Sequence, residues 1–578
     1  MRKKMPFQIL SITLLCVYNI YGVERFSYDE RPGAYETRMR CAYNENYNVP
    51  NYNIENENNG DQETVPDYAG NYTKAFPHDA STGIATDVGQ QSYETLVKAL
   101  KNGKQETYNT IVRTANDASK LVNPQCSAAW SLIGRDSSLV PLALPPKLDS
   151  RWAACEMAEV YLQAICRDVS FNDYGTGQGT DRDTDGQSIT QKAANLLNAY
   201  GNDYKGAKPV TPANLFRGPD AGCLVGPYLS QFFWQDLHFL NQPLAIINPY
   251  IPTASKHEFG VTWDNFVSIQ DGFVPVAYGP TDFDGQRYAI NGRDAGTWVH
   301  NDLPVDSYNN ALNVLINNGF PSAPNLPYFN GLMPNEDPFG TMGAPDTSQL
   351  IAAVSVQALK EAWAHKWRAA RRLRPEAMAG LAHQAKVTGE NPYGLNDALF
   401  ATLGGVNVMD WTLARNITQN PLDPNNATYL LGLMYPEGSP THPSYPAGHA
   451  TVAGACTTVI KALVADQALF ADYLTPVKPN PNDPTLLIAL TNAEGANLIT
   501  VGGELDKLAS NIALARDFAG VHYRSDGDYG INLGELVAIY FLQDWAATYA
   551  EEKFDGFELT KRNGQRIRIT ANDIAVIS

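Results

Sequence analysis

Ser439-Pro-Thr-His442-Pro-Ser-Tyr-Pro446-Ala447-Gly448-His449 runs directly into Ala450-Thr-Val-Ala-Gly-Ala-Cys-Thr-Thr-Val-Ile460. The first stretch is a loop stiffened by prolines, and the second is a run of small and apolar residues that predicts a helix. The first backbone N–H groups of such a helix, around Gly448 and His449, have no partner within it, so they and the helix dipole favour an anion. Gly448 also lets the backbone approach a ligand closely. The sequence therefore predicts an anion site at the start of this helix.

The rest of the chain is predicted to be mainly α. Residues 168–186 and 243–346 are rich in Gly, Pro, Asp and Asn, which indicates loops. Residues 557–570 surround an Asn-Gly pair with strand-like sequence, which predicts a small C-terminal β-hairpin. Apolar residues recur at helical spacing in other segments, namely 152–165, 350–363, 509–516 and 533–549.

An acidic loop at Asp181-Arg-Asp183-Thr-Asp185-Gly186 resembles the opening of an EF-hand. Lys192 stands at the twelfth position, where that motif requires a bidentate glutamate. We therefore interpret the segment as a solvated acidic loop and not as a calcium site.

The composition excludes some classes of partner. The 578 residues include 43 basic and 61 acidic side chains, a net charge of −18, which argues against a nucleic-acid-binding face. The length allows about three or four domains of average size. We divide the chain into a signal segment (1–22), an arm rich in Asn and Tyr (23–90), an N-terminal helical half with long loops (91–340) and a C-terminal helical half (341–578).

The N-terminus predicts secretion. Arg2-Lys3-Lys4 precedes a mostly apolar stretch, residues 7–18, and Gly22 ends it. No later segment approaches the roughly 20 apolar residues of a membrane-spanning helix. Removal of the signal leaves six cysteines, an even number that suits disulfides of unspecified pairing. Three glycosylation acceptors are consistent with export: Asn71, Asn416 and Asn426.

A dense cationic segment stands out in this acidic chain. His365-Lys366-Trp-Arg368-Ala-Ala-Arg371-Arg372-Leu-Arg374-Pro375 places five cations within nine residues. Pro375 disfavours helical geometry at Arg374, which predicts that Arg374 lies at a helix end with its side chain turned inward. The segment is either a solvated basic face or part of an anion site.

A third segment pairs a histidine with a carboxylate. In Arg516-Asp-Phe-Ala-Gly520-Val-His522-Tyr-Arg524-Ser-Asp526, the aspartate lies four residues after His522. A carboxylate at that spacing can fix the imidazole tautomer and make the other ring nitrogen a better electron donor to a metal or to phosphorus. A simple charge pair at a helix end is the alternative.

Together the three segments can hold a tetrahedral oxyanion. They supply three cations (Lys366, Arg374 and Arg516), a helix N-terminus and two histidines. One histidine can attack or ligate the central atom, and the other can donate a proton to the opposite oxygen.

These motifs resemble the three-part signature of vanadium-dependent haloperoxidases and of the related acid phosphatases. The resemblance rests on Lys366-x7-Arg374-Pro375, Pro446-Ala447-Gly448-His449 and Arg516-x3-Gly520-x-His522-x3-Asp526. The spacing, the placement of His442, the length and the signal segment are most similar to the red-algal vanadium bromoperoxidases. The N-terminal half resembles them only in size and general character.

The resemblance implies a vanadate cofactor and a role for each residue. His522 would ligate the metal through Nε2. Lys366, Arg374, Arg516 and the N–H of Gly448 would bind the equatorial oxygens. His449 would act as acid–base, His442 and Trp363 would line the halide pocket, and Asp526 would orient His522. Halide would attack activated hydrogen peroxide and give a hypohalous species that halogenates small organic substrates.

Two positions depart from the family pattern. Ala447 stands where the family has serine, which removes a hydrogen bond worth about 1.5–3 kcal/mol to a charged acceptor and predicts weaker vanadate binding. Trp363 stands where the red-algal enzymes tend to carry arginine, whereas the fungal chloroperoxidases and the brown-algal enzymes have tryptophan there. His442, by contrast, is typical of bromoperoxidases. We expect bromide as the favoured halide, with chloride oxidation left open.

Two other functions remain open on the sequence alone. A secreted acid phosphatase would use the same pocket, with His522 as nucleophile and His449 as leaving-group acid. An inactive cell-wall protein would use its Tyr-rich arm for assembly.

The resemblance also implies two four-helix bundles, a structural calcium, a homo-oligomer that is dodecameric in the red-algal relatives, and no nucleic-acid or membrane partner.

Overall fold

The computed structural model describes residues 34–48, 58–137, 139–238, 245–246, 248–300, 302–419 and 426–577, so the predicted signal segment 1–22 lies outside it. The chain divides into two units, residues 1–48 and 49–578. In the first unit, helix α2 (Ala34–Asn48) lies in the segment that we interpreted from its composition as an arm rich in Asn and Tyr. Tyr35, Met39 and Tyr43 are exposed at four-residue spacing, a helical periodicity that the polar composition obscured.

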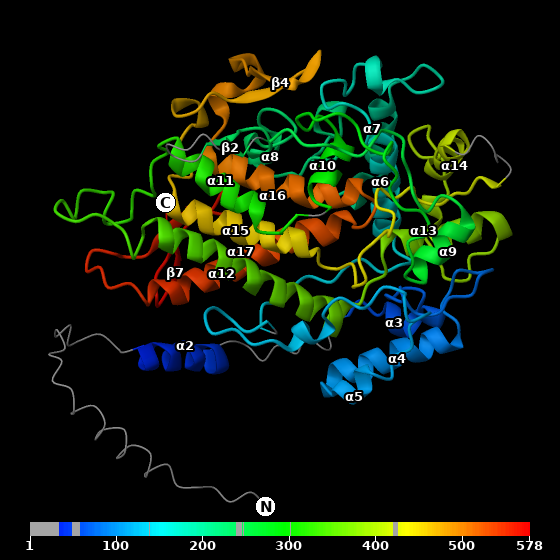
Figure 1. The fold of residues 1–578 in the computed structure, drawn as a ribbon, viewed down its shortest axis with the longest axis horizontal. Coiled ribbons are helices and arrows are strands. Elements are labelled where there is room, and N and C mark those ends of the chain that lie inside the picture. The colour runs from blue at the N-terminus through cyan, green and yellow to red at the C-terminus, as the bar shows by residue number, and fades with distance from the viewer. Residues whose placement is uncertain are drawn as a thin grey trace, which may run out of the picture. The chain divides into compact units, whose positions relative to one another are not determined.

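Four long helices form a bundle in the second unit (Figure 1). Helix α15 lies against α17 so closely that only glycine fits at two contacts. A Cβ on Gly454 would lie 2.1 Å from the Ile531 carbonyl oxygen, and one on Gly534 would lie 2.1 Å from that of Thr451. The small residues of the predicted helix therefore serve close backbone packing. The four helices are α12 (Ala344–Trp363), α15 (Gly448–Leu463), α16 (Val501–Phe518) and α17 (Arg524–Ala546).

A second group of helices packs around α6 (Arg151–Cys166). Its residues from Ala153 to Cys166 are all buried, in agreement with the predicted apolar periodicity. The helices in contact with it are α7 (Ile189–Tyr200), α13 (Pro375–Thr388) and α14 (Val408–Gln419). The mainly helical class predicted from the sequence is confirmed. The boundaries that we set between halves at 90/91 and 340/341 stay predictions.

Several short helices complete the fold. Those within residues 243–346 correct the prediction that this region is largely loop, because helices of 7 to 12 residues carry too few turns to show a clear period. The short helices are α3 (Asp61–Thr64), α5 (Gln105–Tyr108), α8 (Ala221–Leu224), α9 (Trp263–Gln270), α10 (Gly292–Trp298) and α11 (Asp306–Asn317). A further helix, α4 (Asp87–Asn102), is as long as α15.

The strands form three small antiparallel sheets. The predicted hairpin is present as β5 (Phe557–Thr560) and β6 (Arg566–Ile569), and β7 (Ile574–Val576) adds a third strand to it. The other pairs are β1 (Leu237–His238) with β2 (Ala245–Ile246) and β3 (Val477–Asn480) with β4 (Asp483–Ala489).

The folded chain bears on two sequence features that we took as consistent with export, the glycosylation acceptors and the even number of cysteines. Asn71 and Asn416 are 4% and 3% exposed, so neither side chain is open to glycosylation in the folded protein, whereas Asn426 is exposed. Within the described residues no disulfide joins the later cysteines, which are Cys126, Cys155, Cys166, Cys223 and Cys456. Over the same residues, no helix is long and apolar enough to cross a membrane.

Lys192, which stands where an EF-hand requires glutamate, forms ion pairs with the acidic loop 181–186. Lys192 Nζ lies 2.7 Å from Asp183 and 2.5 Å from Asp185. Asp181 is fully buried and accepts hydrogen bonds from Ser188 and from the backbone of Thr190. The acidic loop is therefore solvated only in part, because Asp181 is buried and protein donors occupy its carboxylates.

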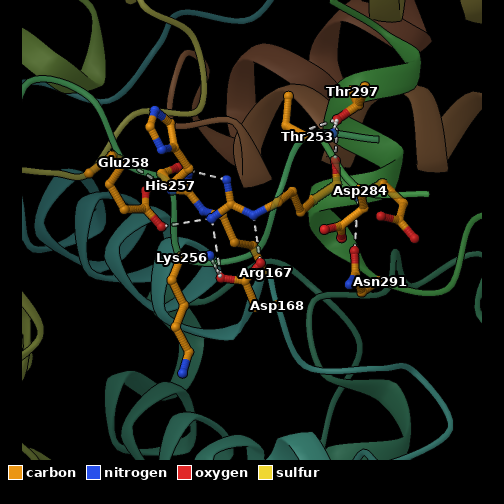
Figure 2. Close-up of polar contacts among 12 residues, drawn as sticks. Arg167, Asp168, Thr253, Lys256, His257, Glu258, Asp284, Asn291 and Thr297 are labelled. Carbon is orange, nitrogen blue, oxygen red and sulfur yellow. Dashed lines mark hydrogen bonds and ion pairs between the residues drawn. The ribbon is translucent and has the colours of Figure 1, made fainter. Parts of the chain in front are cut away.

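A buried ion cluster ties the end of α6 to α10 (Figure 2). Arg293 contacts Asp168 at 2.5 Å and Glu258 at 2.9 Å. Arg167 contacts Glu258 at 3.0 Å, and Arg415 contacts Asp168 at 3.2 Å. Each guanidinium in this cluster thus has a carboxylate partner.

Candidate active site

Lys366 lies in a π-helical turn, Ala364–Ala370, that follows α12. The turn closes with a hydrogen bond from the Arg371 N–H to the Lys366 carbonyl, and π turns of this kind often occur at functional sites. The Lys366 side chain is fully buried, and Nζ donates to the carbonyls of Pro443 and Ser444 at 2.7 Å each. The turn therefore holds Lys366 against the loop that precedes α15.

Arg374 is the N-cap of α13, in extended conformation before Pro375. It begins the following helix, which corrects the idea that it ends the helix of Lys366, but its side chain turns inward as predicted. Its guanidinium donates to the His442 carbonyl at 3.0 Å and to the Val521 carbonyl at 2.7 Å. The same group lies 3.0 Å from His522 Nε2 and 3.0 Å from His442 Nδ1. Arg374 thus joins the two loops that carry the predicted histidines.

His522 is oriented by Asp526, as predicted. Its Nδ1 lies 2.8 Å from Asp526 Oδ2. Burial alone raises the pKa of Asp526, but the charge of Arg372 and the hydrogen bond from His522 outweigh it and hold that pKa below its usual value. A carboxylate only accepts, so Nδ1 carries the proton and Nε2 presents its lone pair toward Arg374. Burial, with the charge of Arg374, lowers the pKa of His522 and keeps the ring neutral.

His449 and Arg516 are the remaining predicted residues of the site, the acid–base histidine and the third cation. His449 lies in the first turn of α15, with Nε2 2.8 Å from Asp302 Oδ1. Arg516 lies in the last turn of α16 and donates to the Val299 carbonyl at 2.7 Å. Within the described part of the chain, the buried Nε of Arg516 has no hydrogen-bond partner.

Trp363 closes over the start of α15. A Cβ on Gly448 would lie 3.0 Å from the indole, so glycine permits this contact. The rings of Trp363 and His442 have centroids 4.9 Å apart, and Lys366 Nζ lies 6.0 Å from the indole centroid. Ala447 is the N-cap and gives the helix no side-chain hydrogen bond. The proposed halide residues therefore border the predicted anion site.

The cations of the predicted anion site lack paired carboxylates. Among the described residues, Lys366, Arg374 and Arg516 form no ion pair with a carboxylate. Burial lowers the pKa of Arg374 to about 10 and that of Lys366 well below its usual value; the charge of Asp526 opposes this at both groups, and that of Arg516 adds to it. The donor set consists of N–H groups and one imidazole lone pair, which fits a tetrahedral oxyanion such as vanadate or phosphate.

Comparison with known proteins identifies the family. Residues 354–551 match the VCPO second helical-bundle domain. The chain is 30% identical to a vanadium-dependent bromoperoxidase of Corallina pilulifera over 95% of this chain and 99% of that one. It is 32% identical to a vanadium-dependent bromoperoxidase of Ascophyllum nodosum over 87% and 86%. The chain belongs to the vanadium-dependent bromoperoxidase family.

The same family supplies a solved structure with this fold. A homohexameric second vanadate-dependent bromoperoxidase from Ascophyllum nodosum superposes with a TM-score of 0.82 at 24% identity, covering 100% of this chain and 96% of that one. The recognition made from the three motifs is therefore confirmed.

Sequence reasoning missed three residues of this bromoperoxidase-family site. Arg372 contacts Asp526 at 2.9 Å and Glu156 at 3.0 Å, and Ser444 also donates to Asp526. Arg372 belongs to the cationic segment, so its presence was visible but its partners were not. Asp302, the partner of His449, lies in a region that has no recognisable motif and no helical periodicity, so nothing in the sequence pointed to it.

The cationic segment divides its side chains between two sides. Lys366 and Arg374 meet at the loop before α15, whereas Arg371 donates to Gln62 at 2.8 Å and His365 contacts the Val140 carbonyl at 2.9 Å. The solvated-face interpretation is therefore wrong for Lys366, Arg372 and Arg374, which are at most 3% exposed.

Proposed function

We propose that this protein uses vanadate and hydrogen peroxide to oxidise halide, bromide above chloride, to a hypohalous species that halogenates small organic molecules. The observation that carries the proposal is the contact of Arg374 with the Nε2 lone pair of His522 at 3.0 Å, at a site whose cations have no carboxylate partner among the described residues. Membership of the bromoperoxidase family supports it.

The residues fit the cofactor as follows. His522 Nε2 would donate its lone pair to the metal, and Lys366, Arg374, Arg516 and the Gly448 N–H would neutralise the oxyanion charge. When bound, vanadate supplies a Lewis-acidic centre that activates hydrogen peroxide without changing oxidation state. Arg372 and Ser444 act through Asp526, which holds the His522 ring in its ligating tautomer.

His449 is placed to move a proton. Its Nε2 contacts the Asp302 carboxylate, so that nitrogen carries the proton and Nδ1 is the atom free to accept one. Proton transfer from hydrogen peroxide to Nδ1 of His449, and its return to a leaving oxygen, is the acid–base role we assign.

His442 and Trp363 form the proposed halide pocket. His442 Nδ1 lies 3.0 Å from the Arg374 guanidinium, which only donates, and 3.1 Å from the Pro443 carbonyl, which only accepts. The indole of Trp363 would exclude water beside it, which strengthens charge interactions there. Bromide remains the favoured halide because His442 is typical of bromoperoxidases.

Halide oxidation with bromide, chloride and iodide in parallel tests the proposal. We expect peroxide- and vanadate-dependent bromination of a phenolic dye, with loss of this activity in His522→Ala. The control His257→Ala alters a partly exposed histidine far along the chain and should leave it intact. Halide oxidation that persists without vanadate would contradict the proposal.

The acid phosphatase remains the second candidate, because the Asp526–His522 pair would also orient Nε2 as a nucleophile toward phosphorus. Peroxide-independent hydrolysis of an aryl phosphate as the dominant activity would favour it. Neither activity, together with no vanadate binding, would favour the inactive cell-wall protein.

We further propose secretion, a homo-oligomer and a structural calcium. The basic and apolar N-terminus supports secretion, which N-terminal sequencing of exported protein would test. A relative is homohexameric, and light scattering would distinguish a hexamer from the dodecamer implied by the resemblance. In the described part of the chain no three His, Cys, Asp or Glu side chains cluster as metal ligands, so calcium rests on the resemblance alone and metal analysis tests it.

A further inference from the structure

A cavity of about 350 Å³ has no part in the proposed function. None of the residues assigned to vanadate or halide lines it. Its volume lies within the range of about 300–1,000 Å³ that small-molecule sites occupy. Its wall combines aromatic rings with a buried guanidinium: Phe171, Tyr174, Arg217, Tyr228 and Trp234.

The aromatic wall is rigid. Phe171 and Tyr228 stack nearly parallel, with centroids 4.0 Å apart and an angle of 5° between the rings. Tyr174 meets both rings edge-on, at 5.4 and 5.8 Å. The indole of Trp234 is fixed by a hydrogen bond from Nε1 to the Ala289 carbonyl at 3.0 Å. Phe171 covers one face of Tyr228 and the Arg217 guanidinium lies over the ring at 5.2 Å, so an aromatic ligand can pack against the edges of this stack at little cost in side-chain entropy.

The wall also carries an unbalanced charge. Arg217 is 8% exposed, and its Nη2 donates to the carbonyls of Gly226 and Pro227. Among the described residues its Nε has no partner, and no carboxylate pairs with the guanidinium. Burial accordingly lowers the pKa of Arg217. The other cation at the cavity, Lys478, is already paired with Glu494.

We propose that this cavity binds a small aromatic carboxylate, its ring against the edges of Phe171 and Tyr228 and its carboxylate on Arg217. The carboxylate supplies the acceptor that the guanidinium lacks, and charge-assisted bonds of this kind are the strong ones. Binding is non-covalent and needs neither vanadate nor peroxide, so the inference goes beyond the proposed function and does not rest on it.

Calorimetry on the full chain without vanadate tests the site, with 4-hydroxybenzoate as probe. Cyclohexanecarboxylate keeps the charge but loses the ring, and 4-hydroxybenzamide keeps the ring but loses the charge. We expect each to bind at least about tenfold more weakly than the probe, since each loses one of the two interactions, worth about 1.4 kcal/mol or more.

A bulky substitution at the cavity rim tests whether the probe binds in this cavity or elsewhere on the protein. Ala213 is exposed on the cavity rim in a short 3₁₀ turn, and Ala213→Trp fills the rim without removing a hydrogen bond. Ala471→Trp is the matched control, because Ala471 is exposed in another three-residue 3₁₀ turn, Phe470–Asp472. We expect at least tenfold weaker binding in the first variant and none of this loss in the second.

Three outcomes would overturn the proposal. One is equal binding of 4-hydroxybenzoate by the two tryptophan variants. The second is the absence of saturable binding at millimolar probe. The third is loss of binding when vanadate is added, which would move the probe to the oxyanion pocket.

Discussion

Two buried clusters of arginine in this protein differ in what balances them. The cluster at the end of α6 includes the carboxylates of Asp168 and Glu258, which Figure 2 labels, and Arg293 contacts both of them. In the oxyanion pocket, the described hydrogen-bond partners of Arg374 are carbonyls and two histidine rings. The first cluster is complete without a ligand, whereas the second leaves positive charge that only an anion can compensate.

The pKa values follow this division only in part. Burial raises the pKa of Asp168, but Arg293 and Arg415 outweigh it and hold that pKa at about 2. Burial lowers the pKa of Arg374 to about 10, and it lowers that of Arg167 in the paired cluster to about 10 as well, so the carboxylate partner and not the pKa separates the two clusters. The comparison teaches that burial of charge marks a structural cluster when the charges pair and a binding site when they do not.

Removing one carboxylate from the paired cluster should have the largest effect. Asp168→Ala leaves Arg293 and Arg415 with a single shared acid, and breaking a buried pair costs about 3–5 kcal/mol. Urea unfolding measures this loss. Asp410→Ala is the control, because that carboxylate is 59% exposed and its pair with Lys386 is worth about 1 kcal/mol or less. Equal losses in both variants would refute the distinction.

Removing a cation from the oxyanion pocket should lower the affinity for vanadate and change the stability of the fold much less. Lys366→Met should weaken vanadate binding about a hundredfold, near 3 kcal/mol, because one charged hydrogen bond to the oxyanion is lost. Without vanadate, unfolding free energy should change by less than about 2 kcal/mol, since relief of the buried charge offsets two lost bonds to carbonyls.

Lys74→Met supplies the matched control for Lys366→Met. Lys74 is equally buried, but its Nζ pairs with Glu376 at 2.7 Å. Its removal leaves a buried carboxylate without its partner and should cost about 3 kcal/mol or more of stability. If Lys366→Met proved the more destabilising of the two in vanadate-free protein, the comparison would fail.

The sequence predicted the pocket because its chemistry is concentrated in short segments. Three motifs carry Lys366, Arg374, His449, Arg516 and His522, and a set of such residues is informative even when each member alone is not. The paired cluster gave no such signal, since its members are scattered and ordinary in type. Complete ion pairs depend on tertiary contacts that no local pattern shows.

The same limit explains the partners that were missed. Asp302 reaches His449 across 147 positions, and Glu156 reaches Arg372 across 216. The even number of cysteines suggested disulfides, but the described later cysteines are free thiols. A count of cysteines carries no information on which thiols lie close together. Buried Asn71 shows that an acceptor sequence likewise says nothing about exposure.

Acid should destabilise the pocket before it destabilises the paired cluster. Burial lowers the pKa of His442 well below 6.5, so below pH 6.5 the unfolded chain binds a proton that the folded chain does not. Stability then falls as the pH drops, by at most about 1.4 kcal/mol per pH unit for this histidine. The contribution of Asp168, whose folded pKa is about 2, is lost only below about pH 4.

Urea unfolding between pH 7.5 and 5 checks this order. His442→Phe should lower the dependence of stability on pH in vanadate-free protein, because it removes the proton uptake of the unfolded chain at that position. Asp168→Ala should leave the dependence unchanged in the same range. An unaltered slope in His442→Phe would contradict the assignment of a neutral, buried ring.

The smallest effect we predict is a gain at Ala447. Ala447→Ser places a hydroxyl at the N-cap of α15, which now has no side-chain cap. The hydroxyl can serve the oxyanion or accept from a free N–H of the helix, and these two uses compete. We therefore expect about tenfold tighter vanadate binding, near 1.5 kcal/mol, at the low end for a charged hydrogen bond.

Two readouts on Ala447→Ser separate the two uses of the hydroxyl. Capping alone would raise unfolding free energy by about 1 kcal/mol and leave vanadate affinity unchanged. Donation to the oxyanion would raise affinity with little gain in vanadate-free stability. Ala450→Ser, one turn into the same helix and also buried, is the control for adding a hydroxyl nearby. Unchanged affinity in Ala447→Ser would show that the residue before Gly448 does not reach the oxyanion, and the pocket would then rest on its cations alone.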